Sequence, residues 1–110
     1  MPIYSGSHYS GCNSERRLIA IWEMNAVGRF LEDKGYPERT KSIYYNYLSD
    51  LLDFFVHEGT AEHIKPYWAN CDQQVISRYI LHLKEQYNSP INISQKLTAI
   101  NSFFDWLSKQ

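Results

Sequence analysis

The chain of 110 residues has no long hydrophobic run, and no stretch approaches the roughly 18 apolar residues that a membrane-spanning helix needs. Its first 14 residues are polar and rich in Tyr, Ser and Gly, so they lack the apolar centre of a secretory signal peptide. A content of 44% hydrophobic and 15% aromatic residues excludes a disordered tail. We therefore expect one soluble, cytoplasmic domain that has no membrane partner.

Residues that bind metals or act as nucleophiles are scarce. The two cysteines, Cys12 and Cys71, are far apart, and two free thiols are expected in a reducing compartment, although one disulfide is conceivable. No two of the four histidines have helical i, i+4 spacing, so we expect no metal site and no cofactor. Cys71 directly precedes a helix cap and is interpreted as a small buried hydrophobe, although a Cys–His pair formed in space stays open.

Motifs for catalysis are also missing. The sequence contains no Gly-rich phosphate loop and no nucleophile elbow. Neighbouring carboxylates such as Asp50 and Asp53 are most simply solvated residues on helix faces, because acid–base catalysis needs two carboxylates held in different environments. We expect no enzymatic activity and no small-molecule ligand from this chain alone.

The balance of charge limits what the chain can bind by itself. Eleven Lys and Arg against twelve Asp and Glu give a net charge of −1. A stand-alone nucleic-acid-binding domain often has a basic excess, so any contact with DNA must come from a local patch or be helped by other parts of a larger protein.

Apolar residues recur at three- and four-residue spacing in four segments, which is typical of amphipathic helices. The first helix is predicted to begin at a cap at Asn13 or Ser14 and to end at Gly35, with Gly28 dividing it in two if it breaks at all. Residues 1–13 are expected to form a flexible segment and 14–110 the helical domain. The predicted buried face of this helix contains Leu18, Trp22, Ala26, Val27, Phe30 and Leu31.

The second helix is expected to run to a stop at Gly59, and its stripe consists of Ile43, Tyr44, Tyr47, Leu48, Leu51, Leu52 and Phe55. A connection follows in which a short helical turn is expected and Ile64, Tyr67 and Trp68 are predicted to pack on the core. Asp72 is predicted to cap the third helix, whose buried side contains Val75, Ile76, Tyr79, Ile80, Leu83 and Tyr87.

The fourth helix is predicted after a break at Asn88 to Pro90, with a stripe of Ile93, Leu97, Ile100, Phe104 and Leu107. Aromatic residues at helical spacing are interpreted as core and not as base-stacking residues: Phe54, Phe55, Phe103, Phe104 and Trp106. Helices with short connections predict an all-α bundle of four to five helices.

Two helix starts share a chemistry that suits nucleic acid. Their sequences are Pro37-Glu38-Arg39-Thr40-Lys41 and Asn92-Ile93-Ser94-Gln95-Lys96. Each combines a cation and a hydroxyl or amide with the free N–H groups and positive dipole end of a helix, which can hold a phosphate. Asn and Gln side chains can also read adenine in the major groove. From composition alone, ordinary capping and solubility are the simpler explanation of the same residues.

The order of these elements resembles a known family. Residues 35–40 with Tyr44, Leu48 and Phe54, the capped helix at 75–83, and residues 96–107 are similar to the N-terminal core-binding (SAM-like) domain of tyrosine recombinases, or phage integrases. The resemblance covers about residues 27–107. It implies an orthogonal helical bundle that, together with a separate catalytic domain expected beyond Gln110, clamps double-stranded DNA for strand exchange.

The resemblance also implies a site. The second and fourth helices would lie against the major groove, with these groove-facing positions: Arg39, Thr40, Lys41, Tyr44, Tyr45, Asn92, Ser94, Gln95, Lys96 and Thr98. The nucleophilic tyrosine would belong to the catalytic domain, so none of the nine tyrosines here is assigned that role. Pro37 stands where many relatives have a capping Ser, and Gln95 and Asn101 stand where relatives often have Arg.

Two hypotheses follow. In the first, the chain is the DNA-binding domain of a site-specific recombinase, whose partners are duplex DNA and other recombinase subunits. This hypothesis requires Lys41 and Lys96 to lie on one surface. In the second, the chain is a protein–protein interaction domain, favoured by its near-zero charge and its many Tyr and Trp residues. A cationic concave face would favour DNA, and an exposed apolar patch would favour a protein partner.

Overall fold

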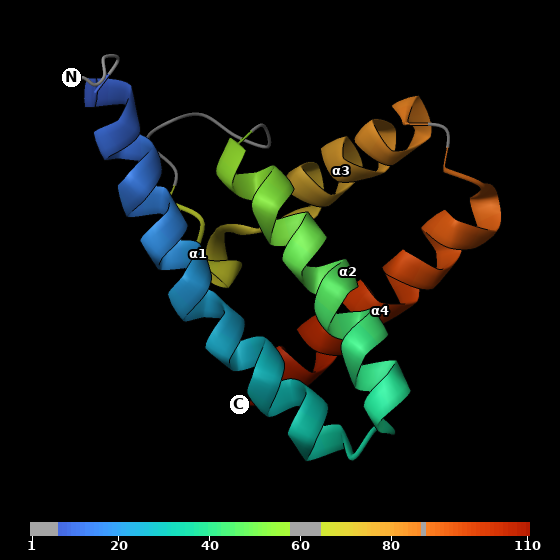
Figure 1. The fold of residues 1–110 in the computed structure, drawn as a ribbon. Helices are drawn as coiled ribbons and strands as arrows, with labels where there is room; N and C mark the ends of the chain where they lie inside the picture. Colours follow the sequence, from blue (N-terminus) through green and yellow to red (C-terminus); the bar gives the residue numbers. More distant parts are fainter. Residues whose placement is uncertain (1–6, 58–64, 87) are drawn as a thin grey trace.

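The computed structural model describes residues 7–57, 65–86 and 88–110, and within them it contains α-helices, one short 3-10 helix and no strand (Figure 1). The elements are α1 (Ser7–Lys34), α2 (Glu38–His57), η1 (Trp68–Asn70), α3 (Gln73–Glu85) and α4 (Pro90–Ser108). The predicted all-α bundle is therefore confirmed, and so is the short helical turn expected in the connection before α3.

Helix α1 is longer than the sequence predicted. It begins at Ser7, so the predicted start at Asn13 or Ser14 is wrong, and it continues through Gly28 without a break. A Cβ at Gly28 would meet no atom within 4 Å, so neighbouring packing does not require glycine there. Gly35 ends the helix with a φ of 66° and donates its N–H to the Glu32 carbonyl at 3.1 Å. Residues 1–6 of the predicted flexible segment and the stop at Gly59 lie outside the described residues.

An aromatic cluster lies at the centre of the bundle. The ring of Phe103 is fully buried and lies 5.4 Å from Phe30 of α1 and 4.8 Å from Trp68 of η1, measured between ring centroids. Phe54, Phe55 and Trp106 are also buried, and Phe104 is partly buried against them, so the prediction that these aromatics form the core is confirmed. One cluster thus joins α1, η1, α2 and α4.

Two capping side chains set the starts of the last helices. Asp72 accepts hydrogen bonds from the N–H groups of Gln74 and Val75, both at 3.1 Å, as predicted for α3. Ser89 caps α4 by accepting from Asn92 N at 3.2 Å, with Pro90 as the first helical residue. The residues predicted to break the chain therefore also start the fourth helix.

Polar contacts join α1 to the other elements. The indole Nε1 of Trp106 donates to Asp33 Oδ2 at 2.6 Å. Trp68 donates from its backbone N to Glu23 Oε1 at 2.7 Å and from Nε1 to the Glu23 carbonyl at 3.0 Å. Trp68 thus fastens the connection to the core as predicted, whereas Tyr67 is exposed and Ile64 lies outside the described residues.

Arg16 closes the end of α2. Its Nε donates to the Val56 carbonyl at 3.0 Å, and its Nη2 donates to the Phe55 carbonyl at 2.9 Å. These carbonyls belong to the last turn of α2, where carbonyl groups lack partners within the helix. A cation at this end also opposes the negative end of the helix dipole.

The first half of α1 departs from its predicted buried stripe. Ala26, Val27, Phe30 and Leu31 are buried as predicted, but Leu18 and Trp22 are 67% and 70% exposed. At about 100° per residue, these two side chains point about 120° and 80° around the helix from Phe30. Ala20 and Met24 pack against the core in this half, and Arg16 and Glu23 bind α2 and η1 beside them.

Candidate nucleic-acid interface

A shallow recess lies where α2 and α4 cross. It is lined by Ile43, Tyr44, Tyr47, Gln95 and Thr98, and we call it the α2–α4 recess. The Tyr47 hydroxyl lies 3.5 Å from Gln95 Oε1, in position to donate a hydrogen bond between the two helices. In Figure 1 the first turns of both helices lie toward the same, right-hand side of the molecule. The structure therefore brings together Tyr44, Gln95 and Thr98, three of the predicted site residues.

Tyr44 is partly buried while it lines the recess. Its ring packs edge-on against Tyr36 at 5.2 Å and lies 6.4 Å from the Tyr47 ring. Burial raises the pKa of the Tyr44 hydroxyl, so this group stays neutral at physiological pH. The core role proposed for Tyr44 is thus confirmed in part, and its role toward DNA stays a prediction.

Lys96 lies beside the recess and against α2. Its Nζ is 3.9 Å from Asp50 Oδ2 and 5.9 Å from the centre of the Tyr47 ring, and 18% of its side chain is exposed. Asp50 Oδ2 also accepts a 2.5 Å hydrogen bond from the hydroxyl of the fully buried Tyr79 in α3. Asp50 is exposed, as expected for a residue on a solvated helix face, and its side chain also joins α2, α3 and α4.

Lys41 lies on another flank of α2. Its Nζ forms ion pairs with Glu32 of α1 at 2.9 Å and with Glu38 at 3.4 Å. The hydrogen bond to Glu32 raises the pKa of Lys41. Tyr45, another predicted site residue, also lies on the side of α2 toward α1, where it lines a groove together with Ile21 and Met24.

The two lysines consequently do not form one cationic cluster. Around α2, Lys41 is about 120° from Tyr47 and about 180° from Asp50, the two residues that Lys96 contacts. The contacts place Lys41 toward α1 and Lys96 toward α3 and α4. The convergence of both lysines that the DNA hypothesis required is not found. The form of that hypothesis in which Lys41 and Lys96 act together is therefore wrong, and a DNA contact at the α2–α4 recess has to be made without Lys41.

The remaining predicted residues lie in or near the first turns of their helices. Arg39 is exposed and Thr40 is half-buried at the start of α2, and Asn92 and Ser94 are exposed at the start of α4. The Thr98 hydroxyl donates to the Ser94 carbonyl at 3.0 Å, inside its own helix. Their roles toward DNA stay predictions.

Two residues of the recess were not in the predicted site. Ile43 and Tyr47 were assigned to the buried stripe of the second helix, but Ile43 is 38% exposed and Tyr47 is half-buried. Tyr47 stands one helical turn after Tyr44, so their shared face was visible in the sequence. Its position opposite Gln95 depends on the crossing of α2 with α4, which local spacing does not encode.

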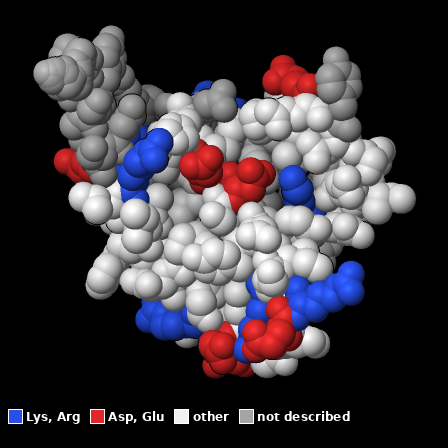
Figure 2. All heavy atoms as spheres, viewed as in Figure 1, with Lys and Arg blue, Asp and Glu red and all other residues white. Residues whose placement is uncertain are grey.

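Charges on the α2 face are mixed. Figure 2 shows acidic side chains above the middle of the face turned to the viewer, basic side chains on either side of them, and acidic and basic side chains together at the bottom. Acidic residues of α2 include Asp50 and Asp53, and Asp53 lies 3.6 Å from His57. This face is not a continuous basic surface, so any DNA contact must rely on a few local cations and on polar groups.

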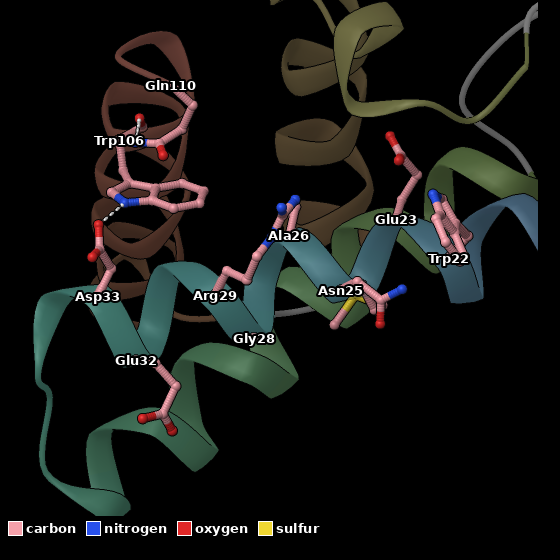
Figure 3. A pocket seen from close by; sticks show the side chains of 11 residues that line it. Trp22, Glu23, Asn25, Ala26, Gly28, Arg29, Glu32, Asp33, Trp106 and Gln110 are labelled. Atoms are coloured by element: carbon pink, nitrogen blue, oxygen red, sulfur yellow. Dashed lines mark hydrogen bonds between the residues drawn. The ribbon is translucent and has the colours of Figure 1, made fainter.

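A second groove follows α1 to the last turn of α4 and the end of the chain. Figure 3 shows Trp22 and Arg29 on α1, and Trp106 and Gln110 at the end of the chain, with the Asp33–Trp106 hydrogen bond at one end. Near it, Leu18 and Ile21 are both 67% exposed. The outer face of α1, defined by Leu18, Ile21 and Trp22, is thus an exposed apolar patch.

Cys71 belongs to the core, as predicted. Its side chain is 7% exposed, and burial, with a smaller contribution from Asp72, raises the pKa of the thiol to about 12. The thiol is therefore neutral at pH 7 and is a poor nucleophile. This environment does not suit a catalytic cysteine.

The Cys71 thiol should consequently resist alkylation in the folded chain. With iodoacetamide at pH 8, we expect Cys71 to react at least about tenfold more slowly than in the chain unfolded by urea, because burial and the raised pKa both suppress the thiolate. Peptide mass spectrometry separates it from Cys12. Equal rates in folded and unfolded chains would contradict the buried position.

The described part of the chain contains neither a cluster of metal-binding side chains nor a helix suited to a membrane. No three His, Cys, Asp or Glu side chains gather there as a metal site would need. None of the helices in that part has the length and apolar character for crossing a bilayer.

Comparison with known proteins assigns the class. Residues 24–110 match the family described as phage integrase, N-terminal SAM-like domain, and the chain belongs to this family. It is similar to the tyrosine recombinase XerC of Salmonella typhi, with 26% identity over 84 residues that cover 76% of this chain and 28% of that protein. No solved structure matches the chain significantly. The chain thus spans little more than a quarter of the length of that relative. The family match begins at residue 24, so the exposed apolar residues Leu18, Ile21 and Trp22 lie outside the matched region.

Proposed function

We propose that this chain is the part of a site-specific tyrosine recombinase that grips duplex DNA at the recombination site. Its contribution is binding, and the chemistry of strand exchange is assigned to a separate catalytic domain. Two findings support the proposal: membership of the family, and the meeting of Tyr44, Gln95 and Thr98 from two helices at one recess. The meeting of these three residues is the observation on which we choose the α2–α4 recess as the DNA-binding surface.

The α2–α4 recess offers the groups that such a grip needs. The Gln95 amide, and that of Asn92 in the first turn of α4, can donate to and accept from an adenine edge in the major groove. Arg39 and Lys96 can contact phosphates, together with the N–H groups at the starts of α2 and α4. Phosphate contacts would position the domain, and the amides would supply sequence preference.

Binding to DNA should depend on salt. With a fluorescein-labelled duplex of random sequence, we expect the logarithm of the association constant to fall against the logarithm of salt concentration with a slope between about −2 and −3. This slope corresponds to two to three neutralised phosphates. Lys41 is not counted among the phosphate contacts, because two carboxylates already hold it. Fluorescence anisotropy between low and physiological salt measures it. An affinity that ignores salt, or no binding at all, would count against the proposal.

A second candidate function is favoured by the exposed patch on the outer face of α1. Leu18, Ile21 and Trp22 present apolar surface to solvent on one helix face, which is typical of a protein-binding surface. The family suggests another recombinase subunit as the partner. In sedimentation velocity of the chain, a Leu18→Ser/Trp22→Ser variant should self-associate less than wild type, whereas Ile91→Ser on α4 should behave as wild type. Identical sedimentation of all three as monomers would dismiss this candidate.

A further inference from the structure

We propose that Asp50 competes with DNA phosphates for Lys96 and thereby limits the affinity of the α2–α4 recess for duplex DNA. This inference rests on the proposed function. Lys96 borders the recess through its contact with the Tyr47 ring and its position next to Gln95. It is the only predicted phosphate-binding lysine in the described residues whose contacts lie on this flank of α2.

Asp50 is held beside Lys96 by a third helix. The buried Tyr79 of α3 donates its hydroxyl to Asp50 Oδ2, the same oxygen that Lys96 Nζ approaches to 3.9 Å. The position of the carboxylate is therefore set by the packing of α3 and does not depend on the lysine. In the free protein, Lys96 has a fixed anion next to it.

The lysine is nevertheless free to leave. A separation of 3.9 Å is beyond hydrogen-bonding distance, and a partly exposed ion pair of this kind is weak. The Asp50 side chain is 53% exposed, whereas only 18% of the Lys96 side chain is exposed, so solvent and a DNA phosphate would reach the pair from the side of the carboxylate. The long flexible side chain of Lys96 would let its ammonium group turn toward such a phosphate. A DNA phosphate would take the place of Asp50 at Lys96, at the cost of the existing pair and of repulsion between the carboxylate and the phosphate.

The chain provides a matched control. Asp53 lies one turn further along α2, carries the same charge and is more exposed, but its ion-pair partner is His57 at 3.6 Å and not Lys96. A general effect of acidic charge near DNA would appear at both positions. An effect that acts through Lys96 would appear at Asp50 alone.

The test measures binding of the 110-residue chain to the fluorescein-labelled duplex as salt is varied. Asp50→Asn is expected to raise the affinity about 5- to 10-fold at low salt, because Lys96 then contacts a phosphate without first leaving a carboxylate. Asp53→Asn should change the affinity less than about 2-fold. Lys96→Met should abolish the gain when combined with Asp50→Asn, as a double-mutant cycle requires.

Asparagine keeps an oxygen that can accept the Tyr79 hydroxyl, so the fold should persist, and thermal unfolding checks this. Asp50→Gln removes the same charge and supplies a second measurement if Asn lowers the melting temperature. The inference is overturned if wild type binds and both Asp50 variants bind no more tightly than Asp53→Asn, or if the gain survives in the Lys96→Met background. If neither wild type nor any variant binds in a salt-dependent manner, the proposed function itself fails.

Discussion

Replacing Phe103 by alanine is expected to lower the free energy of unfolding by about 3 to 5 kcal/mol, the usual cost of removing a buried phenylalanine. The ring is fully buried and contacts Phe30 at 5.4 Å and Trp68 at 4.8 Å, so one truncation weakens the contacts of α4 with both α1 and η1. Domains of this size have a total stability of only about 5 to 15 kcal/mol. The variant should therefore lose a large part of its stability.

Urea denaturation followed by circular dichroism measures this loss. Ile91→Ala provides the control on the same helix, because Ile91 is 69% exposed and its truncation should change the stability by less than about 0.5 kcal/mol. If Phe103→Ala unfolded at the same urea concentration as wild type, the aromatic cluster would not be the centre of the core.

The second large effect concerns DNA. Gln95→Glu is expected to weaken binding to duplex DNA about tenfold or more at low salt, because it places a negative charge in the α2–α4 recess next to Tyr47. It also removes the amide donor that would bind an adenine edge. Gln74→Glu at the exposed first turn of α3 changes the net charge equally and should leave the affinity within about 2-fold. Equal losses from both variants would mean that net charge, and not this recess, controls binding.

Much of the fold could be predicted because its signals are local. Asp72 caps α3 where the sequence indicated, and the aromatic residues at helical spacing form the core. The prediction that Leu18 and Trp22 of α1 are buried was wrong. Apolar spacing identifies the apolar face of a helix, but it does not show whether a neighbouring element covers the whole length of that face. Part of the contact of the first half of α1 with α2 and η1 is made by Arg16 and Glu23, which are polar and therefore gave no signal in the apolar pattern.

The site was predicted less completely. Tyr44, Gln95 and Thr98 meet as the resemblance implied, but Lys41 turns to Glu32 on α1. The direction of a lysine depends on which carboxylates the tertiary fold places nearby, and Glu32 comes from another helix. The contacts of Asp50 could not be predicted for the same reason, because its partners Tyr79 and Lys96 stand 29 and 46 residues further along the chain. Local spacing cannot specify such pairs.

Amide chemical-shift mapping of the labelled chain during titration with duplex DNA tests the central claim most directly. We predict that the largest shifts fall in residues 39–47 and 91–98, on the starts of α2 and α4 and around their recess. The outer face of α1 at Leu18, Ile21 and Trp22 should remain unchanged. Shifts concentrated on that apolar face, or none in either helix start at saturating DNA, would contradict a DNA grip built from α2 and α4.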